Sequence, residues 1–175
     1  NAVTGISASQ LTASAGTITL TNTGAASDIV LNGHLSATNA ALPITTPGIN
    51  VTSGRDIILQ AVNLTTSTSG GVKLTAGNSV NLNGIDICGG ACADFRAISA
   101  VGNVDITATA GAITRSVDDG VSLSGANVTL SAGTNIDSIF GNITATSGNV
   151  LATAAGTLNT TNLTVTGANN VTLST

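Results

Sequence analysis

Short alternations of apolar and polar residues recur along the chain at nearly constant spacing. One series of such segments reads RDIIL, NSVNL, GNVDI, ANVTL, GNVLA and NNVTL, centred on Ile57, Val80, Val104, Val128, Val150 and Val171. By subtraction, the successive spacings are 23, 24, 24, 22 and 21 residues. Alternation with a period of two predicts a strand, and the Gly or Asn before each segment predicts a turn.

Two further series of apolar residues interleave with the first. One series passes through Leu64, Ile87, Ile113, Ile136 and Leu158. The other passes through Ile29, Val51, Val72, Ile98, Val121, Ile143 and Leu163. From Val104 onward the three series alternate in strict order, so each period of about 22 residues predicts three short strands.

A strand of three or four residues cannot bury its apolar face alone. Stacking equivalent strands from successive turns, about 4.8 Å apart, satisfies the backbone and builds a continuous core. We therefore predict an all-β parallel β-helix with three strands per coil, roughly seven coils, and one domain over residues 1–175. A β-sandwich is the alternative, but it does not require three strands in every period of the repeat. Helices are disfavoured because Gly and β-branched residues dominate.

Composition narrows the function classes. Aromatic residues make up 1% of the chain, and Met, Trp and Tyr are absent, so the core must be narrow and aliphatic. Charged residues are only 7%, and the four basic ones form no run, which excludes nucleic-acid binding by a basic patch. No apolar run approaches the roughly 18 residues of a spanning helix. With neither an initiator Met nor a signal sequence, the chain is expected to be a fragment of a longer exported protein.

Repeats such as SGANVTLSAGTNI and TSGNVLATAAGTL, rich in Thr, Ser and Asn, resemble those of filamentous-haemagglutinin-like exoproteins, the adhesins exported by two-partner secretion. The resemblance implies a right-handed β-helix, secreted to the bacterial cell surface, that acts as a structural and adhesive rod. Implied partners are an outer-membrane transporter and a host-cell or matrix receptor or glycan. The rod is expected to be monomeric. An autotransporter passenger is the nearest rival.

Two loop insertions are expected, near residues 38–48 and 86–97. The spacing from Val72 to Ile98 exceeds that of neighbouring coils, so about three or four residues are extra. The first insertion, AALPITTPG, contains both prolines, which predicts a loop beside the sheet rather than a strand.

The second insertion holds both cysteines, Cys88 and Cys92. In an exported protein the expected state is a local disulfide, with free thiols or a redox role as alternatives. Zinc is disfavoured because no second ligand pair or nearby His follows. Asp94, Phe95 and Arg96 form the candidate interaction loop; the alternative is a surface ion pair beside a Phe that fills a gap in the core.

No enzyme, cofactor or metal is expected. Asp118 and Asp119 lie beside Arg115, but adjacent residues of an extended chain point to opposite sides and make a poor catalytic pair. A polysaccharide-degrading enzyme on the same fold is the second hypothesis. An ice-binding face is the third; it needs a regular T-x-T in every coil, whereas the outward positions mix Asp105, Asn81 and Thr129.

Overall fold

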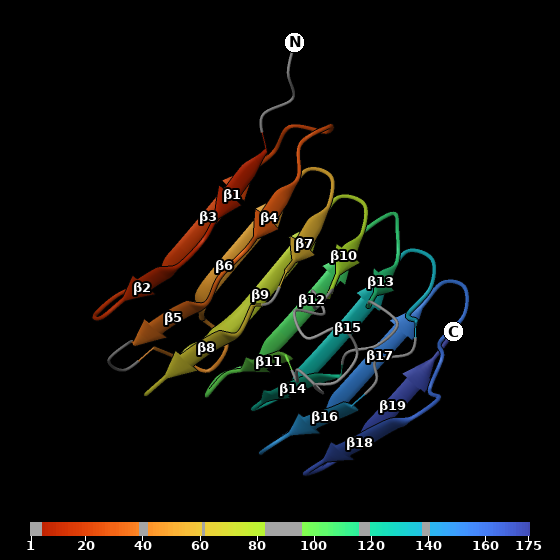
Figure 1. Ribbon diagram of the computed structural model, residues 1–175. Helices are drawn as coiled ribbons and strands as arrows, with labels where there is room; N and C mark the ends of the chain where they lie inside the picture. Colours follow the sequence, from red (N-terminus) through yellow and green to blue (C-terminus); the bar gives the residue numbers. More distant parts are fainter. Residues whose placement is uncertain (1–4, 39–41, 61, 83–95, 116–119, 138–140) are drawn as a thin grey trace, which may run out of the picture.

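The computed structural model describes residues 5–38, 42–60, 62–82, 96–115, 120–137 and 141–175. Those residues form nineteen strands and contain no helix. All the paired strands are parallel, and successive strands of the chain lie in different sheets (Figure 1). The chain therefore winds as a β-solenoid with about three strands per coil, which confirms the predicted fold.

Three sheets, which we call A, B and C, run along the solenoid. Sheet A contains β1 (Ile6–Ala8), β4 (Ile29–Leu31), β7 (Ile57–Leu59), β10 (Val80–Asn81) and β13 (Ile113–Thr114). Single bridges continue it, from Ile113 to Ile136 and from Ile136 to Leu158.

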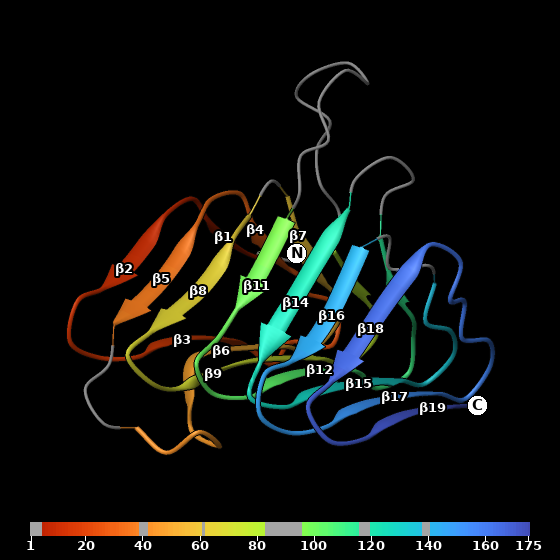
Figure 2. The ribbon, with the colours of Figure 1, turned by 90° about the horizontal axis from the view of Figure 1, so that it is seen from below.

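Sheets B and C have seven strands each, joined by about six turns of chain. Sheet B contains β2 (Leu11–Ala13), β5 (Leu35–Thr38), β8 (Leu64–Ser67), β11 (Arg96–Ser99), β14 (Val121–Gly125), β16 (Gly141–Ala145) and β18 (Leu163–Gly167). Sheet C contains β3 (Ile18–Asn22), β6 (Pro47–Ser53), β9 (Gly71–Ala76), β12 (Val104–Ala108), β15 (Val128–Ala132), β17 (Val150–Ala154) and β19 (Val171–Ser174). Figure 2 shows the strands of sheet B side by side along one face.

The core is a set of aliphatic columns that run along the solenoid axis. In sheet C, paired positions place Val104 beside Val72 on one side and Val128 on the other, and all three are buried. Each buried aliphatic side chain stabilises the fold by roughly 1.5–3 kcal/mol relative to an exposed one. The narrow aliphatic interior expected from the composition is therefore present.

The coils differ in length, and this corrects the predicted series. In sheet A, β10 pairs with β7 on one side and β13 on the other. Between β10 and β13, the paired residues Asn81 and Thr114 are 33 residues apart. Between β7 and β10, the residues just before the strands, Asp56 and Ser79, are hydrogen-bonded and only 23 residues apart. The coil that includes residues 83–95 is thus about ten residues longer than its neighbour, not three or four. Val80 and Val104 lie in different sheets, so their assignment to one series was wrong.

The predicted equivalence of Val72 and Ile98 was also wrong. Val72 pairs with Val104 in sheet C. Ile98 lies in sheet B, where it pairs with Leu64 on one side and Leu123 on the other. The extra residues had shifted the apparent register of the repeat by one strand.

One proline departs from its predicted place. Pro47, expected in a loop beside the sheet, is the first residue of β6. The register between β6 and β9 shifts between Pro47 and Ile49. The first residue of a strand and a bulge are positions where the missing N–H of proline costs no ladder bond.

The residues before β6 are bonded to later coils. The Gly71 N–H donates to the carbonyl oxygen of Thr46, and the Asn103 N–H to that of Ile44, both at 2.9 Å. The described part of this segment therefore lies along the corner between sheets B and C and joins its own coil to later coils by backbone hydrogen bonds.

Candidate functional site

The candidate interaction loop lies mostly outside the described residues. Cys88, Cys92, Asp94 and Phe95 all fall there, so their disulfide and their contact role stay predictions. Arg96 is the first residue of β11, and its backbone position pairs with β14. The described stack thus resumes directly after the loop.

The chain passes from sheet A to sheet B along one edge of the solenoid, which we call the A–B corner. Residues 83–95, 116–119 and 138–140 each connect a position in sheet A to a strand of sheet B, in three consecutive coils. These segments hold both cysteines, both phenylalanines and four of the eight aspartates. All Cys and Phe residues of the chain therefore fall in segments that connect sheet A to sheet B.

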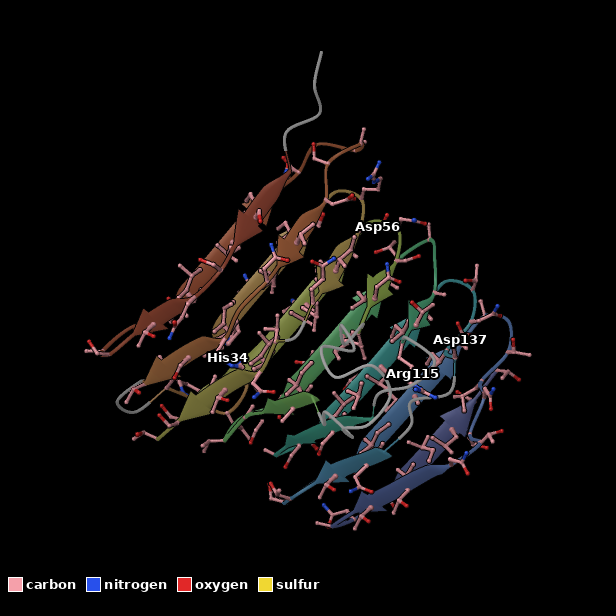
Figure 3. All side chains as sticks on the ribbon, viewed as in Figure 1. His34, Asp56, Arg115 and Asp137 are labelled. Atoms are coloured by element: carbon pink, nitrogen blue, oxygen red, sulfur yellow. The ribbon has the colours of Figure 1, made fainter. Side chains whose placement is uncertain are left out.

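Besides Arg96, the charged residues Arg115 and Asp137 border this corner (Figure 3). Asp137 is exposed, and its backbone N–H donates to the Ile113 carbonyl at 3.0 Å, which fixes it one coil beyond β13. Asp118 and Asp119 lie outside the described residues. In the part of the chain that the structure describes, no three His, Cys, Asp or Glu side chains converge as a metal site would require.

A charged cluster that sequence reasoning missed lies at the corner between sheets C and A. The Arg55 guanidinium forms two hydrogen bonds to the Asp28 carboxylate, one of them from Nε to Oδ1 at 2.5 Å. Arg55 Nε is also 3.5 Å from Asp56 Oδ2. Asp28 and Asp56 directly precede the paired residues Ile29 and Ile57, so the repeat register could have placed them together.

The two carboxylates also hold the backbone of the following coil. Asp28 Oδ1 accepts the Asp56 N–H at 3.2 Å, and Asp56 Oδ1 accepts the Ser79 N–H at 2.9 Å. The hydrogen bond from Arg55 is the main cause that lowers the pKa of Asp28, and burial opposes it. A cavity of about 400 Å³ adjoins the cluster, lined by Gly5, Ile6, Ser7, Ala26, Asp28, Val30 and Arg55. Because both carboxylates are occupied by these bonds, the cluster is structural.

The single histidine has a structural role as well. His34 Nδ1 accepts the Asn63 N–H at 3.0 Å, and Asn63 Oδ1 accepts the Ala97 N–H at 3.0 Å. These bonds connect three successive coils at the entrance to sheet B. His34 therefore serves the backbone ladder rather than a metal.

Sheets B and C each carry one outward column made entirely of hydroxyl residues. In sheet C the column consists of Thr21, Thr52, Thr75, Thr107, Ser131, Thr153 and Ser174. In sheet B it consists of Thr12, Ser36, Thr65, Ser99, Ser124, Thr144 and Thr166.

The neighbouring outward column of sheet C is mixed. It consists of Thr19, Asn50, Lys73, Asp105, Thr129, Leu151 and Thr172. Asn81 belongs to sheet A. Among the seven strands of sheet C, the T-x-T pattern that an ice-binding face needs is therefore present in β3 alone and interrupted in the other six.

In the described ranges, no helix is long and apolar enough to cross a membrane. No family model, no curated protein and no solved structure matches the chain.

Proposed function

We propose that this chain is a rigid, adhesive segment of a secreted bacterial surface protein of the filamentous-haemagglutinin-like type. The observation that carries the proposal is a regular stack in which one coil is about ten residues longer than its neighbour. The core columns and the hydroxyl columns continue from coil to coil across this long coil. Regular coils supply stiffness, and the extra residues of the long coil supply contact residues.

The pairing of β11 shows that the strands of sheet B keep their register on both sides of the long coil. Ile98 of β11 pairs with Leu64 of β8 on one side and with Leu123 on the other. The residues just before the first pair, Asn63 and Ala97, are hydrogen-bonded although they are 34 residues apart. Since the strands of sheets B and C pair in register on both sides of the long coil, the extra residues leave the stack intact. A change of loop sequence at this corner can therefore change the ligand without destabilising the rod.

The proposed setting is outside the cytoplasm. Export through an outer-membrane transporter exposes the chain to oxidising conditions, in which Cys88 and Cys92 form a local disulfide. Alkylation of the exported protein tests this pairing: both thiols should become reactive only after reduction. The ligand is a host-cell or matrix receptor or glycan, and the proposed role involves no catalysis.

The test compares binding of the purified chain to host cells and to a glycan array with that of a variant in which residues 84–95 are replaced by a Gly/Ser linker of equal length. We expect at least a tenfold loss of binding in this variant. The matched control is Ile44→Ser, which alters a side chain 51% exposed at a different corner and should leave binding unchanged. Equal binding by the linker variant would contradict the proposal.

A further inference from the structure

At the A–B corner, side chains of one coil hold the backbone of the next in two consecutive links. His34 Nδ1 accepts the Asn63 N–H, and Asn63 Oδ1 accepts the Ala97 N–H, both at 3.0 Å. The three residues stand in register, because each directly precedes a core residue of sheet B and these core residues pair with one another. His34 therefore occupies, in its coil, the place that an asparagine occupies in the next.

The two acceptors of these links differ in their response to acid. Nδ1 of His34 and Oδ1 of Asn63 are both bonded to Cγ, so they reach equally far from the backbone. An amide oxygen remains an acceptor between pH 5 and 8, whereas both nitrogens of a protonated imidazole are donors. Histidine is the side chain that ordinarily changes charge in this range. Mild acid therefore replaces the acceptor of the first link with a donor that faces the Asn63 N–H.

Solvent reaches His34, and the strands around it bring no competing charge. The side chain of His34 is exposed. Strands β2, β4, β5 and β8 carry no charged or titratable side chain. Among the described residues, the nearest charged position along the chain is Asp28, before β4, and the nearest along the links is Arg96, which begins β11 two coils on. Figure 3 shows His34 well apart from Asp56, a member of the charged cluster at the corner between sheets C and A.

We propose that His34 makes the contact between its coil and the next pH-sensitive: neutral His34 holds the Asn63 N–H, and protonated His34 releases it. One proton passes from solvent to Nδ1 and one hydrogen bond is lost. The backbone bonds beside it do not titrate: the Leu11 N–H donates to the His34 carbonyl oxygen at 3.1 Å, and the Leu35 N–H to that of Asn63 at 3.0 Å. The release is therefore local. It loosens the corner beside the start of β11 without unfolding the stack, and it is independent of the ligand that the rod binds.

The test is amide hydrogen exchange in the full isotope-labelled chain, followed by NMR at pH 7.5 and at pH 5. Each rate is converted to a protection factor, which removes the intrinsic effect of pH on exchange. We expect the protection of the Asn63 amide to fall about fivefold at pH 5, the factor that corresponds to one hydrogen bond of ordinary net strength. The Asn149 amide is the internal control, because its acceptor in the same kind of link is Asn127 Oδ1, at 2.8 Å. Its protection should not change.

Two variants separate protonation of His34 from other effects of acid. His34→Asn supplies a δ oxygen that does not titrate, so the Asn63 amide should stay protected at both pH values. His34→Ala removes the acceptor, so protection should be low at both. Circular dichroism verifies that each variant is folded, and the comparison of Asn63 with Asn149 in the unchanged chain stands even if a variant does not fold. Equal protection of Asn63 at the two pH values overturns the proposal. So does a fivefold loss that persists in His34→Ala, since that assigns the loss to another group.

Discussion

At the scale of single residues, one contact recurs at the corners: a side-chain acceptor in one coil accepts a backbone N–H of the next. Asn127 shows it at the corner between sheets B and C. Its Oδ1 accepts the Asn149 N–H at 2.8 Å, and its Nδ2 donates to Asn103 Oδ1 at 3.0 Å. Asn149 Oδ1 in turn accepts the Asn170 N–H at 3.1 Å. The abundance of Asn in the sequence therefore has a structural reason.

Replacing an asparagine of this ladder should be more harmful than replacing one outside it. Asn127→Ala removes the acceptor of one backbone N–H and a side-chain bond, and we expect it to cost about 1–3 kcal/mol of unfolding free energy. Asn142→Ala is the control, because Asn142 is exposed on sheet B and should change stability by about 0.5 kcal/mol or less. Urea denaturation measures both, and equal effects would contradict the ladder.

The ion pair of Asp28 and Arg55 predicts a pH-dependent contribution to stability. The hydrogen bond from Arg55 lowers the pKa of Asp28 in the folded state, so folding favours the carboxylate. That contribution is fully present above the unfolded pKa of about 3.9 and is lost as the pH falls through the lower folded value. Arg55→Gln should therefore lower thermal stability modestly at pH 7, less in high salt, and not at all at the lowest pH. A deficit that is the same at pH 7 and pH 2 would refute this role.

At the scale of elements, the position of a residue in a column decides its contribution. Leu130 and Leu173 occupy the same column of sheet C, but Leu130 is fully buried between two coils while Leu173 lies at the end. Leu130→Ala should destabilise the chain by about 2–5 kcal/mol, since it leaves a cavity with neighbours on both sides. Leu173→Ala should cost clearly less. Urea denaturation of both variants provides the comparison.

The sequence predicted where the strands lie along the chain better than it predicted which strands pair with one another. From Val104 onward the predicted order of strands is that of the structure. Upstream, the series slipped by one strand at the long coil, which has about ten extra residues, and also between Ile29 in sheet A and Val51 in sheet C. Successive strand positions are only seven to nine residues apart: Val104 to Ile113 is nine, and Val121 to Val128 is seven. An insertion of about ten residues is therefore about as long as one strand and its turn, so the repeat pattern does not distinguish the two. RDIIL in sheet A also resembles GNVDI in sheet C, so the pattern alone does not identify the sheet.

The candidate site was only partly predictable for a related reason. Rare residue types identified the segment around Cys88, but its grouping with residues 116–119 and 138–140 depends on the correct coil register. The bonding of Asp28 to Asp56 across one coil requires the same register. Side chains that act across coils therefore become visible in a solenoid sequence only after the coil lengths are known.

At the scale of the whole molecule, about six turns of chain make a short rod. Six steps of about 4.8 Å separate the first and last strands of sheets B and C, a length of about 29 Å. The longest strand of sheet C, β6, spans about 23 Å at about 3.3 Å per residue, so the width of a coil is similar to the length of the stack. One copy alone is therefore not markedly elongated. Stiffness over a longer distance depends on further coils.

The register across the long coil is the central claim, since the pairing of β11 and β12 with the earlier coils depends on it. Backbone NOEs in the isotope-labelled chain test it directly. We predict NOEs that connect the Val72 amide with Asn103 and Val104, because the Val72 N–H donates to the Asn103 carbonyl oxygen at 2.8 Å. NOEs that connect Val72 with Ile98 instead would restore the constant period of the predicted series and contradict the account.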